Sequence, residues 1–395
     1  MTDSAAGGGS IPATMASRTA PPVAAGPLLD YDGRLGRLYW LFIKNLLLSI
    51  VTFGVYRFWG RTNIRRYVWS HTRFMGDAFE YTGKGSELFA GFLIVFGFFF
   101  VVSTLTQIFI VAVGFDSPLV PYFDIVFALA VGYFAFVAQY AAQRYRLTRT
   151  VWRGLRGSMS GSAWSYGFYA FLLSLLSGAT LTLAWPWARS RLIERRLGNS
   201  YFGDEKVSVA FSARPLYPSY IVGLVVFAIG LGIAGWLGFV ALQHADFFNR
   251  VMDLFTFGTE PEGPDDTDAM MAIIGLIIAV YFLAMLIVAL LYTLSFAWFQ
   301  ATTARIVAAH SRFQDLRFSS SVTGGNMAML AIGNFLLILL TAGLAIPIVI
   351  QRSIRYVVRH LHVSGVLDVE RLQQAALAKP RTGEGLLEAF DPGLF

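Results

Sequence analysis

The sequence predicts an all-α, polytopic integral membrane protein with four long transmembrane helices and three related helical segments that break or re-enter within the membrane. The first reason is composition, because 56% of the 395 residues are hydrophobic and only 14% are charged, whereas soluble domains carry about a quarter charged residues. The second reason is four long apolar runs, since crossing a hydrocarbon core takes roughly 20 helical residues. The third is a motif that recurs in three shorter apolar segments.

The two ends of the chain are predicted to lie outside a membrane domain of residues 30–365. Residues 1–29 are rich in Ala, Gly, Pro and Ser and lack a charged segment leading into an apolar one. We therefore expect a disordered tail rather than a signal peptide. Residues 366–395 carry mixed charges and a helical pattern at Val369 to Leu377, which predicts a soluble helix followed by a loose tail.

Four transmembrane helices are expected where the sequence is almost free of charge, at about 88–114, 122–143, 218–243 and 270–297. Three further apolar segments are ambiguous, because each has arginines on both sides. They lie at about 38–56, 164–187 and 328–350. These segments could cross the membrane, or they could enter it and return.

The distribution of charge favours four spans. If all seven segments crossed, lysines and arginines would divide 12 against 18 between the two sides. If only four cross, 29 lie on one side and Arg250 alone on the other. Because basic loops stay in the cytoplasm, we expect two spanning hairpins with both chain ends cytoplasmic. The three other segments then enter and return, which backbone tolerates only where protein or a wet cavity covers it.

The three ambiguous segments resemble one another, which predicts repeat units at about 38–83, 164–204 and 328–365. Residues 43–76 match residues 332–365 at 11 of 34 positions without a gap, including Asn45 with Asn334 and Gly54 with Gly343. The middle segment aligns through two sets of residues: Thr180, Trp187 and Arg189 match Thr52, Trp59 and Arg61, and Pro186 and Arg191 match Pro347 and Arg352.

Each unit reads as an apolar helix, a break that begins with Thr, and a second, basic helix. Glycine at the break frees the backbone, whereas Pro186 and Pro347 stop a helix. Trp59 and Trp187 suit the headgroup boundary. The arginines that follow would then lie where they can meet phosphates.

These blocks carry a family resemblance. Asn45-Leu46-Leu47-Leu48, Thr52 to Tyr56 and Gly76 to Gly83, together with Asn334 and Thr341 to Pro347, resemble the conserved blocks of the bacterial YjgN family, a domain of unknown function. The resemblance covers about residues 30–365. It implies a polytopic protein of the bacterial inner membrane and brings no known substrate, reaction or residue roles. The Pro-Trp pair of the pattern is incomplete here, as Phe58-Trp59 and Pro347-Ile348.

The candidate residues for binding a solute or lipid are those that the motif repeats, together with a lysine inside an apolar segment. They are Lys44, Asn45, Thr52, Gly54, Trp59, Arg61, Arg66, Thr180, Pro186, Trp187, Arg189, Arg191, Asn334, Thr341, Gly343, Pro347, Arg352 and Arg355. An ionisable group at membrane depth is a functional candidate, but Lys44 could equally reach the headgroups. Asn45 and Asn334 could bond to each other across repeats or hold adjacent helices together.

Several kinds of chemistry are not expected. There is no cysteine, and the five histidines have no acidic residue at matching positions, so we predict no metal site and no cofactor. No catalytic set is recognisable, and we expect no enzyme. The net charge of +7 comes from 31 basic residues, of which 27 are arginine. In so apolar a chain, this charge points to anionic lipid headgroups rather than to nucleic acid.

Two functions remain open on the sequence. Repeats with broken helices are what transporters use to build a site, so the leading expectation is a permease or channel-like transporter of a small, possibly anionic, solute or lipid. The alternative is a non-transporting membrane scaffold or anionic-lipid-binding protein. Transport predicts polar residues that converge on a cavity between the repeats, whereas scaffolding predicts dry packing.

Overall fold

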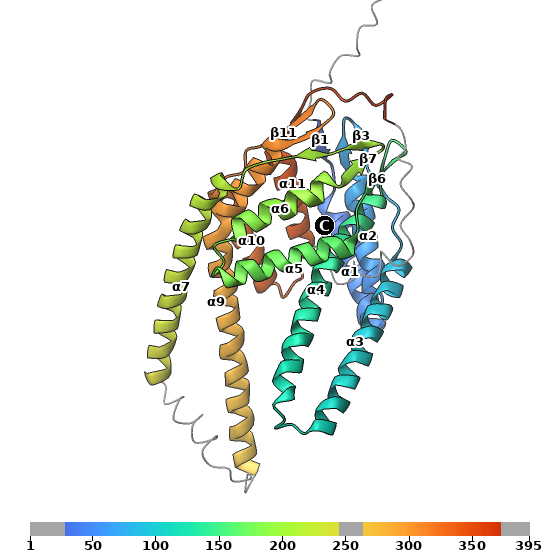
Figure 1. Ribbon diagram of the computed structural model, residues 1–395. Coiled ribbons are helices and arrows are strands. Elements are labelled where there is room, and N and C mark those ends of the chain that lie inside the picture. The colour runs from blue at the N-terminus through green and yellow to red at the C-terminus, as the bar shows by residue number, and fades with distance from the viewer. Residues whose placement is uncertain (1–27, 245–263, 373–395) are drawn as a thin grey trace, which may run out of the picture.

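The computed structural model describes residues 28–244 and 264–372, and this part of the chain is mainly helical (Figure 1). The expected tail at residues 1–27 and the C-terminal residues 373–395 lie outside the described residues. The helices are α1 (Leu35–Val51), α2 (Arg57–Ser70), α3 (Gly85–Val113), α4 (Leu119–Thr148), α5 (Ala163–Ala179), α6 (Trp185–Gly198), α7 (Tyr217–His244), α9 (Pro264–His310), α10 (Gly324–Leu340) and α11 (Ile346–His360), with a 3-10 turn at Arg214–Leu216.

Four of these helices, α3, α4, α7 and α9, are long and apolar enough to cross a membrane, as predicted. At most 11% of the most apolar stretch of each is buried against protein. Figure 1 shows them as two hairpins, α3–α4 and α7–α9, that project from a body containing the strands and the other helices. Their apolar side chains therefore lie on the outside, as a lipid environment requires.

Helices α4 and α9 continue beyond their apolar stretches into the body. The last turns of α4 are buried at Tyr140, Ala142 and Tyr145, and the corresponding end of α9 is buried at Phe299 and Ala301. The same two helices thus face outward along most of their length and form the core at their ends. This arrangement brings polar residues near those ends into contact with the rest of the fold.

The other helices form three pairs, α1–α2, α5–α6 and α10–α11. The first helix has 17 residues in every pair, and the second has 14, 14 and 15. Each first helix ends in a Schellman motif, in which the second residue after the cap donates its backbone N–H back to the helix. These donors are Gly54 to the Ser49 carbonyl at 2.6 Å, Thr182 to Ser177 at 2.7 Å and Gly343 to Ile338 at 2.9 Å.

A threonine closes each break from both sides. The Thr52 hydroxyl donates to the Leu48 carbonyl at 2.7 Å and accepts the Tyr56 backbone N–H at 2.9 Å. Thr180 makes the same two bonds in the second pair, and Thr341 makes them in the third. The residue after each threonine is left-handed, with φ of 48° at Phe53, 49° at Leu181 and 47° at Ala342.

Twelve short strands join the described helices, which the sequence analysis did not anticipate. They are β1 (Leu29–Tyr31), β2 (Thr72–Phe74), β3 (Asp77–Ala78), β4 (Glu80–Tyr81), β5 (Thr150–Trp152), β6 (Leu155–Met159), β7 (Ser200–Phe202), β8 (Glu205–Lys206), β9 (Ser208–Val209), β10 (Ser311–Phe313), β11 (Leu316–Ser320) and β12 (Leu361–Ser364). They form three sheets with the orders β1-β2-β3, β4-β5-β6-β7-β8 and β12-β11-β10-β9. All the ladders between the described strands are antiparallel, such as that of β5 with β6.

Tight turns explain these strands. Met75 and Gly76 in one hairpin, and Arg153 and Gly154 in another, have positive φ, as two-residue hairpin turns require. Strands of two to five residues are too short to show an alternating pattern.

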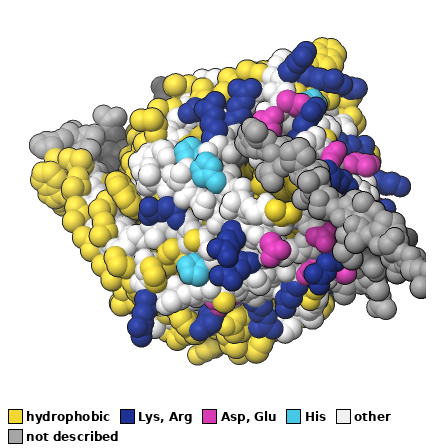
Figure 2. All heavy atoms as spheres, turned by 90° about the horizontal axis from the view of Figure 1, so that it is seen from above, with side chains coloured by type: hydrophobic (Ala, Val, Ile, Leu, Met, Phe, Trp, Pro, Cys, Tyr) yellow, Lys and Arg dark blue, Asp and Glu magenta, His cyan; other side chains and the backbone are white. Residues whose placement is uncertain are grey.

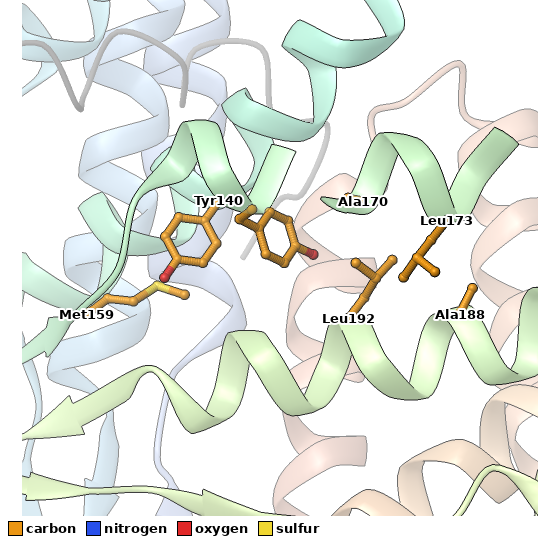
Figure 3. Close-up of a cluster of buried hydrophobic side chains, with 7 residues drawn as sticks. Tyr140, Met159, Ala170, Leu173, Ala188 and Leu192 are labelled. Atoms are coloured by element: carbon orange, nitrogen blue, oxygen red, sulfur yellow. The ribbon is translucent and has the colours of Figure 1, made fainter. Parts of the chain in front are cut away.

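The second helix pair packs through an apolar core. Leu173 and Ala170 of α5 lie against Ala188 and Leu192 of α6 (Figure 3). Tyr140 of α4 belongs to the same cluster, and Gly167 of α5 allows α4 to approach closely, since a Cβ there would meet Val137 at 2.3 Å. The second pair is therefore fixed against α4, which positions the face of α6 that carries arginines.

Candidate functional site

A cavity of about 560 Å³ lies where α4, α6, α9, α10 and the β10–β12 strands meet. Its size is within the range of small-molecule sites. Six polar side chains contribute to its lining: Gln143, Arg189, Arg196, Gln300, Thr303 and Ser311. No acidic residue is among the described residues that line it. The two guanidinium groups make this a positively charged cavity in a mainly apolar surrounding.

Arg189 is the most unusual group in this cavity. Its guanidinium carbon lies 5.2 Å from the centre of the Phe299 ring. It makes no hydrogen bond or ion pair with any residue in the described part of the chain. Glu194, the nearest acidic residue along α6, instead pairs with Arg191 at 3.1 Å and accepts the Phe211 backbone N–H at 2.8 Å.

The surroundings of Arg189 disfavour its charge without removing it. Burial lowers the pKa of Arg189 from its usual value, and the nearby charge of Arg196 lowers it further. Arginine nevertheless remains protonated in proteins. Arg189 is half-buried, and a cation that is partly removed from water without a counter-charge is costly, so an anion that enters this cavity would be stabilised there.

A second, smaller cavity of about 250 Å³ adjoins the first, and we call it the aromatic slot. Arg189 and Gln300 line both cavities. The walls of the slot come from the start of α7, the C-terminal half of α9, and the second helix pair with its break. The other residues that line it are Ser177, Thr182, Trp185, Tyr220, Leu224, Phe227, Tyr292, Phe296 and Phe299.

The break of the second pair is tied to this slot. The Tyr220 hydroxyl donates to the Thr182 carbonyl at 3.0 Å. Thr182 has φ of +68°, whereas the matching residues in the other pairs are Gly54 and Gly343. A β-branched residue in the left-handed region is strained. Such strain is found at functional sites more often than elsewhere, and it singles out the second pair.

In the first pair, most of the predicted site residues have structural roles. Lys44 is exposed. Asn45 is buried, and its side chain donates to the Gly60 carbonyl at 3.2 Å. The ring of Trp59 packs on that of Phe89 in α3, with 5.7 Å between the ring centres. The Arg66 guanidinium donates to the Gly83 carbonyl at 2.7 Å. Thr52 and Gly54 form the break described above, and Arg61 does not line the charged cavity.

In the other two pairs, only Arg189 enters the charged cavity among the predicted residues. Pro186 and Pro347 are buried in the first turns of α6 and α11. Asn334 donates to Ser353 at 3.3 Å within its own pair, so the two asparagines do not bond to each other. The remaining predicted residues lie at the breaks or outside this cavity: Thr180, Thr341, Gly343, Trp187, Arg191, Arg352 and Arg355.

Arginines also cover the end of the molecule opposite the hairpin tips. Figure 2 shows Lys and Arg side chains scattered over this face, with fewer acidic ones among them. Arg66 lines a separate cavity of about 600 Å³ here, together with Arg37, His71 and Glu80. Its described lining therefore includes an acidic side chain, which the lining of the charged cavity does not.

The sequence analysis missed most of the residues that form the charged cavity. Gln143 and Gln300 each lie in an apolar run of the sequence. A polar amide side chain in such a run could have marked both residues as functional candidates. The aromatic residues of the slot carried no signal, because phenylalanine and tyrosine recur throughout the spans. No group of three or more His, Asp or Glu residues that could hold a metal occurs within residues 28–244 and 264–372.

The fold and this site define a class, a polytopic helical membrane protein with a charged cavity beside two spanning hairpins. The chain belongs to the family of bacterial proteins of unknown function DUF898, whose model matches residues 27–389.

The named relatives share a low sequence identity with this chain, over only part of its length. The inner membrane protein YjgN of Escherichia coli K12 is 23% identical over 203 residues, which are 51% of this chain and 44% of the relative. The same protein of Escherichia coli O157:H7 is 22% identical over equal shares. YjgN of Salmonella typhimurium LT2 is 29% identical over 79 residues, or 20% of either chain. The matches thus span less than half of these relatives, and no solved structure matches the chain.

Proposed function

We propose that this protein is a transporter of a small anionic solute or lipid in the bacterial inner membrane, and that Arg189 binds the anion. One observation carries the proposal: the guanidinium of Arg189, which has no hydrogen-bond or ion-pair partner among the described residues, shares a cavity with Arg196, two glutamines and Thr303. Arginine holds carboxylate and phosphate groups in a bidentate way, and amides and hydroxyls complete the set of donors. The proposal assigns no chemical reaction to the protein.

The proposed place in the membrane follows from its relatives and its surface. The YjgN relatives are named inner membrane proteins. We place both chain ends and the arginine-rich face in the cytoplasm, where basic residues are retained. We further propose that the three helix pairs are copies of one unit that dip into the cytoplasmic leaflet. Their breaks expose apolar residues in support of this, with Phe53 98% and Leu181 82% exposed.

A non-transporting protein that binds anionic lipid is the second candidate. It is favoured by the spans, because at most 11% of the most apolar stretch of each is buried against the described protein. Under this proposal, the anion stays in the cavity and the basic face recruits headgroups.

Proteoliposomes separate the two candidates. The purified protein would be reconstituted in phosphatidylcholine and tested for binding of radiolabelled inorganic phosphate and for its release from loaded vesicles. Arg189→Gln should lower both by more than tenfold. Arg305→Gln is the matched control, because Arg305 lies on α9 but is exposed and does not line the cavity.

The outcomes have distinct meanings. Binding that depends on Arg189 without release would support the lipid-binding alternative and contradict transport. Phosphate binding that is equal in the wild type and in Arg189→Gln would contradict both candidates.

A further inference from the structure

We infer that the natural ligand is a single-chain anionic amphiphile, whose head lies at Arg189 and whose apolar chain lies in the aromatic slot. This inference rests on the proposed function and adds the class of the ligand. It starts from the fact that Arg189 and Gln300 line both cavities, so that a charged cavity and an apolar one meet at the same two side chains.

The slot is built for an apolar group. The rings of Tyr220 and Phe299 lie 5.1 Å apart, those of Tyr292 and Phe296 lie 4.9 Å apart, and Phe227 lies 5.9 Å from Phe296. These rings belong to the two candidate spans α7 and α9. Aromatic side chains supply large apolar contact areas, and the only cation in the described lining of the slot is Arg189, which also lines the charged cavity.

The slot also opens toward the lipid side of the hairpin. Tyr292 lines the slot and is 49% exposed. Its ring lies 6.0 Å from that of Phe227 on α7. The same helix carries Ile221 and Val222, which are exposed apolar residues on a candidate span. A ligand that is already in the cytoplasmic leaflet could therefore enter the slot sideways with its chain, without crossing water.

The size of the slot limits the number of chains. Its volume of about 250 Å³ is below the roughly 300–1,000 Å³ of sites that hold a drug-sized ligand. One aliphatic chain fits such a slot, whereas the two chains of a bilayer phospholipid do not. The adjoining cavity of about 560 Å³ leaves room for a head larger than a bare phosphate.

The probe for this inference is dodecyl phosphate with a photoreactive diazirine at the end of its chain, added to the full-length protein in phosphatidylcholine nanodiscs. We expect cross-links at slot residues such as Phe227 and Tyr292, identified by mass spectrometry. Unlabelled dodecyl phosphate should compete at least tenfold better than two-chain phosphatidic acid or uncharged dodecanol. Cross-links spread evenly along the lipid-facing side of α7 would overturn the inference, as would equal competition by phosphatidic acid.

A variant that fills the slot provides the second test. Leu224→Trp should reduce cross-linking at least tenfold, because Leu224 lines the slot. Val225→Trp is the matched control, since Val225 is the next residue on α7 and is 51% exposed, and it should change cross-linking less than twofold. Unchanged cross-linking in Leu224→Trp would overturn the inference.

Inorganic phosphate distinguishes a failure of this inference from a failure of the proposed function. If Leu224→Trp has no effect but Arg189→Gln still weakens phosphate binding, the ligand is a soluble anion and the proposed function stands. If Arg189→Gln does not weaken phosphate binding, the proposed function itself is wrong.

Discussion

The first and second helix pairs have the same frame, by which we mean the same helix lengths and the same hydrogen bonds at the break. They differ in the residues that pack between the two helices and in the residue that ends the break. Both consist of helices of 17 and 14 residues, and a threonine makes the same two hydrogen bonds at each break. Counted from that threonine, however, the residues that pack between the helices and the residue that ends the break differ. The frame therefore does not determine what a pair contains.

The contact between the two helices shows this most clearly. Seven residues before the threonine, the first pair has Asn45 and the second has Leu173. Eight residues after it, the first pair has Gly60 and the second has Ala188. The first pair is joined by a buried hydrogen bond from Asn45 to the Gly60 carbonyl, and the second by apolar packing of Leu173 on Ala188. A polar and an apolar solution thus support the same geometry.

The arginine nine residues after the threonine also differs in its surroundings. It is Arg61 in the first pair and Arg189 in the second, and the third pair has Ile350. Only Arg189 of these lines the charged cavity. The difference comes from the neighbours rather than from the helix pair, because α9 lies beside α6 and contributes Phe299, Gln300 and Thr303. The second pair is therefore the one to which our proposal assigns anion binding.

The largest effect is expected when the polar residue of the first pair is placed in the second. Leu173→Asn should lower the free energy of unfolding by about 3–5 kcal/mol, because it removes a buried leucine and leaves an amide without a partner. The midpoint of thermal unfolding in detergent would measure this. The reciprocal change, Asn45→Leu, replaces a hydrogen bond by apolar contact and should cost only about 1–2 kcal/mol. Equal losses would mean that the two contacts are interchangeable.

The next effect concerns binding at the two equivalent arginines. Arg189→Gln should weaken phosphate binding by about 10- to 100-fold, since a hydrogen bond to a charged group contributes about 1.5–3 kcal/mol. Arg61→Gln should change it less than threefold. Isothermal titration calorimetry on the purified protein would measure both. An equal loss in the two variants would show that the arginines act through overall charge, and would remove the special role of the second pair.

Much of the fold could be predicted from the sequence, because long apolar helices depend mainly on composition. The four spans follow from runs almost without charge, which a membrane helix requires whatever it contacts. The breaks could also be located from Thr52, Thr180 and Thr341. The strands could not, since their two to five residues are specified by hairpin turns at residues such as Met75 and Gly76 rather than by an alternating pattern.

The site was only partly predictable for a different reason. The repeated motif includes Arg189, and this residue does line the cavity. The other members, such as Gln143 and Gln300, come from helices far away in the sequence and meet Arg189 only because α4 and α9 extend into the body. By contrast, two other residues of the motif hold helices together. Asn45 joins α1 to α2 through a hydrogen bond to Gly60, and Trp59 packs on Phe89 of α3. A residue of the motif can therefore serve helix packing alone, and the cavity also takes residues from outside the motif.

A smaller effect is expected at the break itself. Thr182→Gly should stabilise the protein by about 0.5–1 kcal/mol, because it relieves a left-handed conformation that costs roughly 1–2 kcal/mol while adding the conformational freedom of glycine to the unfolded chain. Gly54→Thr should destabilise it by a similar amount. Thermal unfolding in detergent measures both. If Thr182→Gly lowers the midpoint instead, the threonine side chain contributes contacts in the slot that outweigh its strain.

The smallest effect tests how tightly the first pair is packed. A Cβ at Gly60 would lie 3.1 Å from the Cβ of Asn45, which is closer than usual, whereas alanine is better than glycine in a helix by about 1 kcal/mol. We expect these terms to cancel, so that Gly60→Ala changes the stability by less than about 0.5 kcal/mol. In an Asn45→Gly background the Cβ at position 45 is absent, and the same change at Gly60 should then stabilise by up to about 1 kcal/mol. Gly178→Ala in the second pair, where a Cβ meets nothing within 4 Å, supplies the helix preference alone. Gly60→Ala and Gly178→Ala could also raise the stability of the wild-type background by the same amount. Asn45 would then move aside at no cost in free energy, and the polar contact of the first pair would be no more rigid than the apolar contact of the second.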